Sequence, residues 1–553
     1  MMKKTMLAVI LYLSVMLLYS DFIAPGDLQP GMTGYCLTVF KGDKPDTFNV
    51  KLIDIIENYN GGRTVLLVEC LGENVEETGI AQGMSGSPVY FNGKLAGSLS
   101  YTWSNMKKPI GAVTPIDDML KLKTFEQEMN GETYRFKRIE APLIIDGVST
   151  GIIESVRDID INSMLDNAES GISGSRPGSG NVPETEPGHA VAIKLIDGDM
   201  QVSAIGTCTY TEGNDIYMLG HALYTKGQIN YPVSPAYIYS VIPRSDMSFK
   251  LGIAYDSNIA AGMQDRNTGV YALRNRDADM IPVSINLAGE NIEMEFVRDE
   301  DVIMTMLPLM YIGAIGRRIK SGGALTAGYI MKIVTENSGT TQYQNTVSSE
   351  TALMEIYTDL QSILYAYLKN IFKAPQIIRI DIESDIYEDI RRLSVSEILI
   401  EKKYYYPGET IKGSIIFNEF RGGRHRESFT LEIPPSLSSD SLSILAVNGR
   451  NEMVFELNRN EGRYNFTNLG TLMSIIDSLN PSNAVIIKLI EMKKGAADMN
   501  REYSSLPGTA VRSMINTGSR EINTDVVSEQ TILTNGVITG EQSITVKLRR
   551  KHD

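Results

Sequence analysis

The stretch Gly-Ile-Ala-Gln-Gly-Met-Ser-Gly-Ser-Pro-Val-Tyr at 79–90 is the most informative part of the sequence. Within it, Ser85 lies between Gly83-Met84 and Gly86. Glycine permits the tight backbone that exposes a serine and turns the preceding amides toward one point. A serine hydroxyl needs a neighbouring base to become a nucleophile, and its attack needs N–H groups aimed at the developing oxyanion. The stretch therefore suits a catalytic serine at Ser85, and the alternative interpretation is an ordinary Gly/Ser turn.

The residues on both sides of this stretch have the pattern of a β-rich protein. Asn92-Gly93 separates two apolar runs. This is the strongest short hairpin signal, because a type I′ turn needs positive φ at both central residues. Runs of β-branched and aromatic residues bounded by turn residues predict further strands. These runs lie at 34–40, 48–56, 64–70, 190–195, 201–210 and 215–219. We therefore expect a mainly β fold.

The serine segment resembles a known catalytic element. Gly-Met-Ser-Gly-Ser-Pro at 83–88 is similar to the Gly-Asp-Ser-Gly-Gly-Pro element of chymotrypsin-like peptidases, which also precedes a β-hairpin. The resemblance implies that Ser85 is the nucleophile and that Ser87 occupies the later glycine position. It also implies that the amides of Gly83 and Ser85 form the oxyanion hole.

A wider resemblance links the chain to the SpoIVB peptidase family. The stretch 79–90 is close to that family's signature around its nucleophile, and further segments resemble its flanking parts and its histidine half. These segments are 31–40, 111–120, 188–192, 198–199, 206–210 and 219–221. The serine half precedes the histidine half here, whereas the sporulation proteins have the opposite order. A triad tolerates such a permutation because its geometry defines it.

Composition narrows the choice of the general base to one histidine. His189 directly follows a Gly/Ser/Pro-rich segment, His425 lies in the charged loop 421–427, and His552 lies in the C-terminal tail. Only His221 follows an apolar strand and a glycine, which places it at a strand end. We therefore predict His221 as the base that activates Ser85.

The acidic member of the triad is less clear. The SpoIVB family carries an aspartate before its serine, but that region here reads Val68-Glu69-Cys70-Leu71-Gly72-Glu73 and holds no aspartate. Asp265 follows His221 by 44 residues, close to the roughly 45-residue His-to-Asp spacing of chymotrypsin. We predict Asp265 as the third member, with Glu69 and Glu73 as alternatives.

The N-terminus predicts export. Lys3 and Lys4 are followed by the almost wholly apolar run Met6–Leu18 and by the small residue Ser20. This is the layout of a secretory signal peptide over residues 1–20. We expect a periplasmic or extracellular protein, associated with the membrane only if this segment stays uncleaved.

Charge and cysteine content exclude several classes of function. The net charge of −15 argues against nucleic acid, which needs clustered Lys and Arg, and against electrostatic attraction to anionic lipid. Cys36, Cys70 and Cys208 have no C-x-x-C spacing, and the histidines are not paired in sequence. We expect no metal site and no cofactor. A bridge between Cys36 and Cys70 stays open.

The chain is long enough for several domains. Apolar residues recur at three and four positions over 353–368, which predicts a packed helix. We expect a chymotrypsin-like double β-barrel core, followed by a C-terminal β-sandwich-like or α+β accessory region. The expected parts are 1–20 (signal), 24–125 (serine-bearing half), 126–186 (connector, with a flexible linker at 167–187), 187–300 (histidine-bearing half), 301–375 (helical), 376–450 (β accessory) and 451–553 (α+β).

Together these features predict an exported SpoIVB-like serine endopeptidase. By the resemblance, it would perform limited proteolysis of a protein in the cell envelope through an acyl-enzyme formed by Ser85 and His221. The alternative is a non-catalytic binding protein of the same fold, which the missing family aspartate favours.

Overall fold

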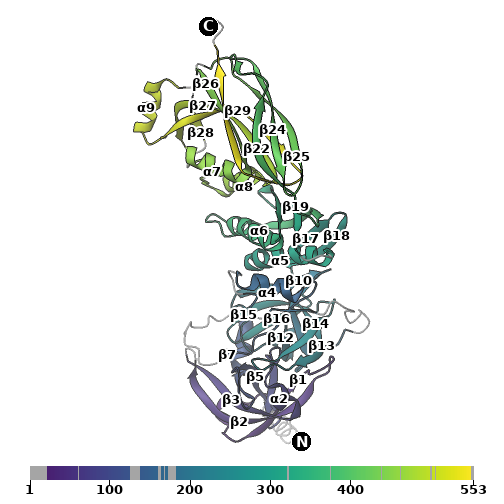
Figure 1. Cartoon of the computed structure of the whole chain (residues 1–553). Coiled ribbons are helices and arrows are strands. Elements are labelled where there is room, and N and C mark those ends of the chain that lie inside the picture. The colour runs from purple at the N-terminus through teal and green to yellow at the C-terminus, as the bar shows by residue number, and fades with distance from the viewer. Residues whose placement is uncertain are drawn as a thin grey trace, which may run out of the picture. The chain divides into compact units, whose positions relative to one another are not determined.

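The computed structural model of the chain contains two compact units (Figure 1). One comprises residues 1–281 and 294–314, and the other comprises residues 282–293 and 315–553. The structure describes residues 21–59, 62–124, 137–159, 164–166, 168–171, 182–319, 323–373, 375–437, 439–460, 462–498, 501–504 and 506–549. The expected signal peptide, His552 and part of the expected linker lie outside these residues.

The serine-bearing segment forms a closed six-stranded barrel. The strands pair in the order β4-β1-β2-β3-β6-β5, and β4 also pairs with β5 to close the ring. The β4–β5 turn has positive φ at Asn92 and Gly93, as the sequence predicts. The strands are β1 (Thr33–Thr38), β2 (Asp46–Tyr59), β3 (Arg63–Leu71), β4 (Ser87–Phe91), β5 (Lys94–Thr102) and β6 (Ile110–Pro115).

The histidine-bearing segment forms a second closed barrel with the same topology. Its order is β10-β13-β15-β16-β12-β11, and β10 pairs with β11. In both barrels the strands follow one another around the ring as first, second, third, sixth, fifth and fourth in the chain. The strands are β10 (Ala190–Gly198), β11 (Val202–Glu212), β12 (Asp215–Met218), β13 (Gly227–Ile242), β15 (Ala260–Arg266) and β16 (Gly269–Arg274). The mainly β, chymotrypsin-like double barrel is thereby confirmed.

The connector between the barrels is more ordered than expected in its described residues. β7 pairs with β5, and β8 pairs with β11 and β9. Buried apolar side chains of the connector explain this order: Ile139 packs in the hydrophobic core of the first barrel, and Ile144 packs in a cluster with residues of β10 and β11. The elements are β7 (Lys137–Arg138), β8 (Leu143–Ile145), α4 (Thr150–Arg157) and β9 (Ala168–Ser170). The first unit also holds η1 (Pro25–Asp27), α2 (Glu73–Thr78), α3 (Ile116–Leu120), η2 (Lys121–Thr124) and β14 (Phe249–Ala254).

Cys36 and Cys70 are free thiols buried in the first barrel. Cys36 in β1 is paired with Phe48 of β2, and Cys70 in β3 is paired with Val50 of β2. The two cysteines are thus separated by two strand spacings, about 9.5 Å. A disulfide needs Cα atoms within about 7 Å, so the bridge that the sequence left open does not form.

The expected helical segment 301–375 contains a β-hairpin between its helices. The hairpin consists of β19 (Leu325–Thr335) and β20 (Gly339–Ser349), and its alternating burial explains why helical periodicity is missing there. β19 also pairs with β21, which runs parallel to β17. The other elements are β17 (Met280–Leu287), β18 (Glu290–Val297), α5 (Glu300–Arg318), α6 (Ala352–Leu368) and β21 (Ile377–Tyr387).

The two C-terminal parts expected at 376–450 and 451–553 form one β-sandwich, not two domains. The late strands β30 and β31 pair with the early strands β22 and β26, and residues of both parts share one hydrophobic core. The strands are β22 (Arg392–Ile400), β23 (Tyr404–Tyr405), β24 (Thr410–Glu419), β25 (Arg424–Glu432), β26 (Ser441–Asn448), β27 (Ala484–Asp498), β28 (Arg501–Tyr503), β29 (Arg520–Leu533), β30 (Val537–Thr539) and β31 (Glu541–Leu548). The helices are α7 (Gly449–Arg459), α8 (Leu469–Asp477) and α9 (Gly508–Asn516).

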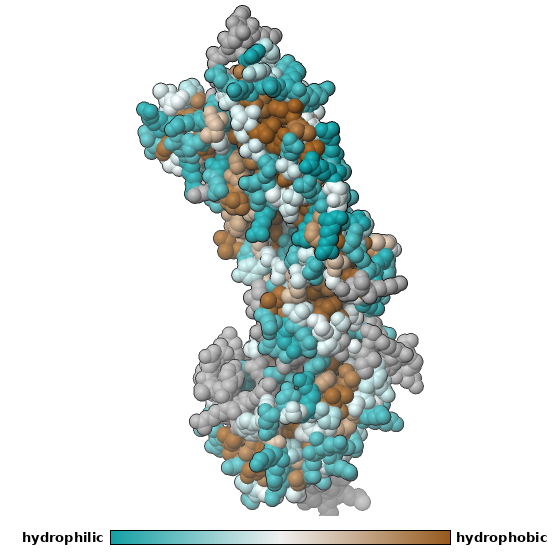
Figure 2. All heavy atoms as spheres, in the orientation of Figure 1, coloured by the Kyte–Doolittle hydropathy of each residue, from teal (hydrophilic) through white to brown (hydrophobic). Residues whose placement is uncertain are grey.

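Hydrophilic side chains cover most of the face shown in Figure 2, and hydrophobic side chains gather in separate areas. One of these areas lies over the sheets of the C-terminal sandwich. Among the residues that the structure describes, no helix is both long and apolar enough to cross a membrane.

Candidate active site

Ser85 and His221 occupy equivalent positions in the two barrels. Ser85 lies in the connection between β3 and β4, the third and fourth strands of the first barrel. His221 lies in the connection between β12 and β13, the third and fourth strands of the second barrel. Because the two barrels share one topology, each barrel contributes one candidate residue from the same connection, the one between its third and fourth strands.

The Ser85 loop is attached to β11 of the second barrel. Thr207 N donates to Ser85 O at 2.8 Å, and Thr207 Oγ1 donates to Gly83 O at 2.9 Å. Thr209 Oγ1 donates to Gly86 O at 2.8 Å. Gly86 has a φ of +97°, and a Cβ atom there would lie 1.8 Å from Thr207 O. Only glycine allows this close approach of the loop to β11.

The His221 loop is attached to the first barrel in turn. Thr114 Oγ1 donates to Gly220 O at 2.7 Å. A Cβ atom at Gly220 would lie 2.1 Å from Ser100 Oγ and 2.3 Å from Ser98 Oγ, so this backbone lies directly against β5. Ser85 and His221 are both buried, with exposed fractions of 0% and 2%. The site is thus formed where each barrel receives a loop from the other.

The hydrogen bonds of His221 show a conformation in which the ring is not a base for Ser85. Nδ1 lies 2.8 Å from Ala222 O, and Nε2 lies 2.7 Å from Ile139 O. Both oxygens are acceptors, and only a doubly protonated imidazolium donates to both. Within the described part of the chain, Ser85 Oγ has no hydrogen-bond partner. A buried hydroxyl without a partner is costly and commonly marks a functional position.

Asp265 lies at the base of the His221 loop. Its buried carboxylate accepts hydrogen bonds from Leu223 N at 2.6 Å, Tyr224 N at 2.8 Å and Lys226 N at 3.1 Å. Hydrogen bonds from several amides to one carboxylate are among the stronger bonds in proteins. Asp265 therefore fixes the backbone that directly follows His221.

The two alternative acids lie elsewhere in the first barrel. Glu69 in β3 forms an ion pair with Lys108 at 2.7 Å. Glu73 is exposed at the first residue of α2. Among the contacts of the described residues, neither carboxylate reaches His221. Of the predicted acids, the structure associates only Asp265 with the histidine loop.

Lys250 in β14 is a further residue of the site that sequence reasoning missed. Its aliphatic chain lies 3.1–3.2 Å from the position of a Cβ at Gly83. Its Nζ donates to Thr38 Oγ1 at 2.8 Å and to Thr207 Oγ1 at 3.2 Å. Burial lowers the pKa of Lys250 to about 7. A lysine inside the apolar strand Phe-Lys-Leu-Gly-Ile-Ala at 249–254 was the available signal.

Lys250→Met should change how stability depends on pH. An unfolded lysine has a pKa of about 10.4, whereas the folded value is about 7. Between these values the unfolded chain binds more protons, so the free energy of unfolding rises with pH, by up to about 1.4 kcal/mol per unit. The contribution of Lys250 to the free energy of unfolding is complete above its pKa in the unfolded chain. It is lost as the pH falls through its pKa in the folded chain. Lys250→Met should lack this slope.

Denaturant unfolding at pH 7 and pH 9 measures the slope, and the single tryptophan, Trp103, reports on the first barrel. Lys51→Met, at an exposed position of β2, is the matched control and should keep the wild-type slope. A wild-type slope in Lys250→Met as well would assign the titration to another group.

The cysteines and the charged side chains offer no competing centre in the described residues. Burial raises the pKa of Cys70 and Cys208 to about 12, which keeps both as thiols and makes them poor nucleophiles. Across the described ranges, no group of three or more His, Cys, Asp and Glu side chains is placed to hold a metal ion.

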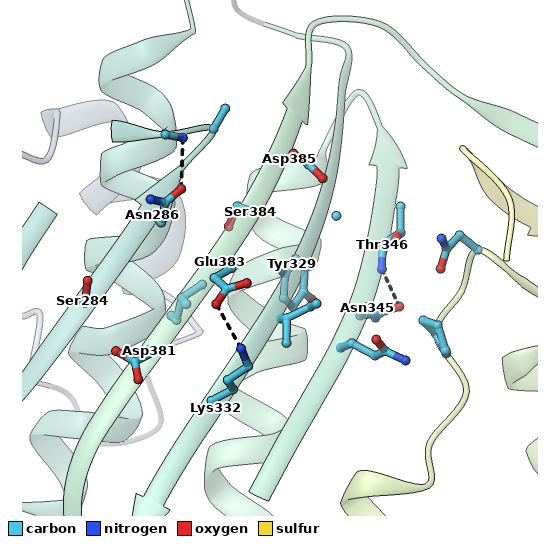
Figure 3. A pocket seen from close by; sticks show the side chains of 18 of the residues that line it. Ser284, Asn286, Tyr329, Lys332, Asn345, Thr346, Asp381, Glu383, Ser384 and Asp385 are labelled. Atoms are coloured by element: carbon cyan, nitrogen blue, oxygen red, sulfur yellow. Dashed lines mark hydrogen bonds and ion pairs between the residues drawn. The ribbon is translucent and has the colours of Figure 1, made fainter. Parts of the chain in front are cut away.

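A polar recess of about 850 Å³ lies in the second unit, over β17, β21, β19 and β20 (Figure 3). Four of its charged side chains form two ion pairs: Lys332 pairs with Glu383 at 3.0 Å, and Arg379 pairs with Asp381 at 2.7 Å. Ser284 Oγ donates to Glu293. These contacts give no pairing of a nucleophile with a base.

The chain was compared with known proteins. Residues 25–120 match the family model of the SpoIVB peptidase S55 family. The matched segment is the first barrel, including Ser85, and it ends before His221. The family prediction made from the motif at 79–90 is thereby confirmed. No curated protein and no solved structure matches the chain.

Proposed function

Because residues 25–120, which form its first barrel, match the SpoIVB peptidase S55 family model, we propose that this chain is a serine endopeptidase with Ser85 as nucleophile and His221 as general base. The observation that carries the proposal is the crossed docking of the two loops. Each loop comes from the equivalent connection of its barrel and is hydrogen-bonded to the other barrel. Ser85 and His221 thus come from opposite halves of a double barrel.

The proposed reaction is peptide hydrolysis in two steps. Ser85 Oγ attacks the carbonyl carbon of the scissile bond while His221 takes the hydroxyl proton. The amides of Gly83 and Ser85 stabilise the oxyanion. The C–N bond then breaks as His221 returns the proton to the leaving amine, and an acyl-enzyme remains. Water, deprotonated by His221, hydrolyses that ester and restores Ser85.

Asp265 is the proposed positioning residue for His221. Its three hydrogen bonds to the backbone amides of residues 223–226 support this role. A triad acid sets the orientation of the imidazole and stabilises the imidazolium that forms during attack. Asp265 would supply a negative charge beneath the histidine loop and hold that loop in register.

The function is tested by labelling the purified full chain with a fluorophosphonate. A serine activated by a base and an oxyanion hole reacts with this probe, whereas ordinary serines do not. Mass spectrometry of the digested protein should place the adduct on Ser85. An adduct on another serine would reject Ser85 as the nucleophile. The absence of any adduct, in the wild type and in every variant tested, would reject it as well.

The proposed substrate is a protein of the cell envelope, cut at a limited number of sites. The N-terminal pattern of two lysines and an apolar run supports export, and the family resemblance supports a protein substrate. If the signal is cleaved, the mass of the exported protein should correspond to a chain that starts near Asp21. An unprocessed protein found only in the cytoplasm would contradict export.

A non-catalytic binding protein is the second candidate. The contacts of both His221 ring nitrogens with main-chain carbonyls favour it, because such a ring does not accept the proton of Ser85. The same labelling experiment separates the two candidates, since a binding protein needs no reactive serine.

A further inference from the structure

The connector between the barrels passes through the proposed active site. β7 pairs with the first barrel and β8 with the second, so residues 139–142 cross from one barrel to the other. Ile139 N donates to Ser100 O at 2.9 Å, and Pro142 O accepts from Ile205 N at 3.1 Å. The crossing segment is therefore held by a hydrogen bond at each end.

Two carbonyl groups of this segment contact the groups that the proposed mechanism uses. Ile139 O lies 2.7 Å from His221 Nε2, and Glu140 O accepts from Gly83 N at 3.3 Å. Nε2 is the nitrogen that faces the serine in chymotrypsin-type triads. Gly83 N–H is a proposed donor to the oxyanion. A substrate carbonyl would need this same amide, and the segment already occupies it.

Side chains of the segment are anchored as well. Ile139 is fully buried in the hydrophobic core of the first barrel. The Glu140 carboxylate accepts a hydrogen bond from Gln82 Nε2 at 3.3 Å, and Gln82 belongs to the loop that carries Ser85. Ala141 is 8% exposed. Removing the segment would expose Ile139, so the observed conformation is favoured by apolar burial.

We propose that residues 139–142 are an internal inhibitor, which occupies the substrate site and holds the peptidase inactive. The proposal rests on the proposed function and concerns the regulation of that same site. It accounts for the buried Ser85 hydroxyl, which has no hydrogen-bond partner among the described residues, and for a His221 ring whose two nitrogens both lie against main-chain carbonyls. Departure of the segment lets the Nε2 proton pass to solvent, after which the neutral ring can accept the serine proton, and it frees Gly83 N–H for the substrate oxyanion.

The test compares the rate of fluorophosphonate labelling at Ser85 in the full chain. Ile139→Ala removes the buried anchor of the segment and leaves its backbone unchanged. If the open form is a minor population of the wild type, the variant should react at least about tenfold faster. Leu143→Ala is the matched control, because Leu143 is equally buried but lies in β8, beyond the segment. It should react at the wild-type rate.

A peptide of residues 137–142, with blocked ends, adds a second measurement. It should slow the labelling of Ile139→Ala, while a scrambled peptide of the same composition should not. If Ile139→Ala does not fold, Gln82→Ala replaces it, since it removes the hydrogen bond to the Glu140 carboxylate and leaves the buried side chain of Ile139 in place.

The outcomes separate the two proposals. Equal labelling of Ser85 in wild type and variant, or equal acceleration by Leu143→Ala, overturns the internal inhibitor and leaves the peptidase intact. Absence of any label on Ser85 in wild type, in Ile139→Ala and in Gln82→Ala overturns the proposed function, and the inhibitor with it.

Discussion

Ser85→Ala is expected to abolish hydrolysis of a peptide substrate, with a loss in kcat of up to about 10⁶-fold. Without the hydroxyl no acyl-enzyme forms, and only the oxyanion hole and substrate binding still contribute. Turnover should be measured in the Ile139→Ala background, in which the proposed internal inhibitor is loosened. KM should change little, because the methyl group of alanine leaves the substrate site open.

The stability of Ser85→Ala distinguishes a catalytic loss from a structural one. Ser85 Oγ is buried and has no hydrogen-bond partner among the residues that the structure describes. Its removal should leave the free energy of unfolding unchanged or raise it by about 1 kcal/mol. Ser87→Ala is the matched control, since Ser87 is equally buried two residues further along, at the first position of β4. An inactive Ser87→Ala, or an active Ser85→Ala, would show that the loop acts through its shape and not through the Ser85 hydroxyl.

Asp265→Asn is expected to lower kcat by up to about 10⁴-fold, the size of effect seen when a triad acid becomes an amide. Asparagine offers one acceptor oxygen where the carboxylate accepts from three amides of the His221 loop. The negative charge that would stabilise the imidazolium is lost as well. KM should change far less than kcat, because substrate binding does not use this group.

A structural role alone would have a different signature. Asp299→Asn is the control, because Asp299 binds Lys226 and Tyr231 beside the same loop. It should lower stability, with kcat within a few-fold of wild type, whereas His221→Ala should be at least as damaging as Asp265→Asn. If Asp299→Asn lowers kcat as strongly as Asp265→Asn, order in the loop is sufficient and Asp265 is no triad member.

The local sequence determined those turns, strands and helices that depend on residues close together in the chain. The Asn92-Gly93 turn follows from the positive φ that these residues tolerate, and the strands of both barrels follow from runs of β-branched and aromatic residues. The glycines around Ser85 predicted a tight loop, and the helix at α6 follows from its 3.6-residue periodicity. The short motif at 79–90 also sufficed to predict the family that residues 25–120 match.

Pairing between distant segments decided what the sequence left open. The barrels close through β4–β5 and β10–β11, and the C-terminal sandwich is completed by strands far along the chain from their partners. Such pairings depend on the whole fold and cannot be predicted from a local pattern. The domain boundary predicted at 450 was therefore wrong, because residues on both sides of it share one hydrophobic core. The same limit applied to 301–375, where the hairpin β19–β20 was missed.

The surroundings of the candidate site were likewise set by tertiary structure. Asp265 could be selected by its spacing from His221, but only the fold shows its hydrogen bonds to the histidine loop. Lys250 enters the site from β14, and its pKa falls because three-dimensional packing removes it from water. The contacts of Ile139 with the His221 ring and of Glu140 with Gly83 N are made by backbone carbonyls, which every residue possesses. A group common to all residues leaves no trace in the amino-acid pattern, so only its position in the folded chain identifies it.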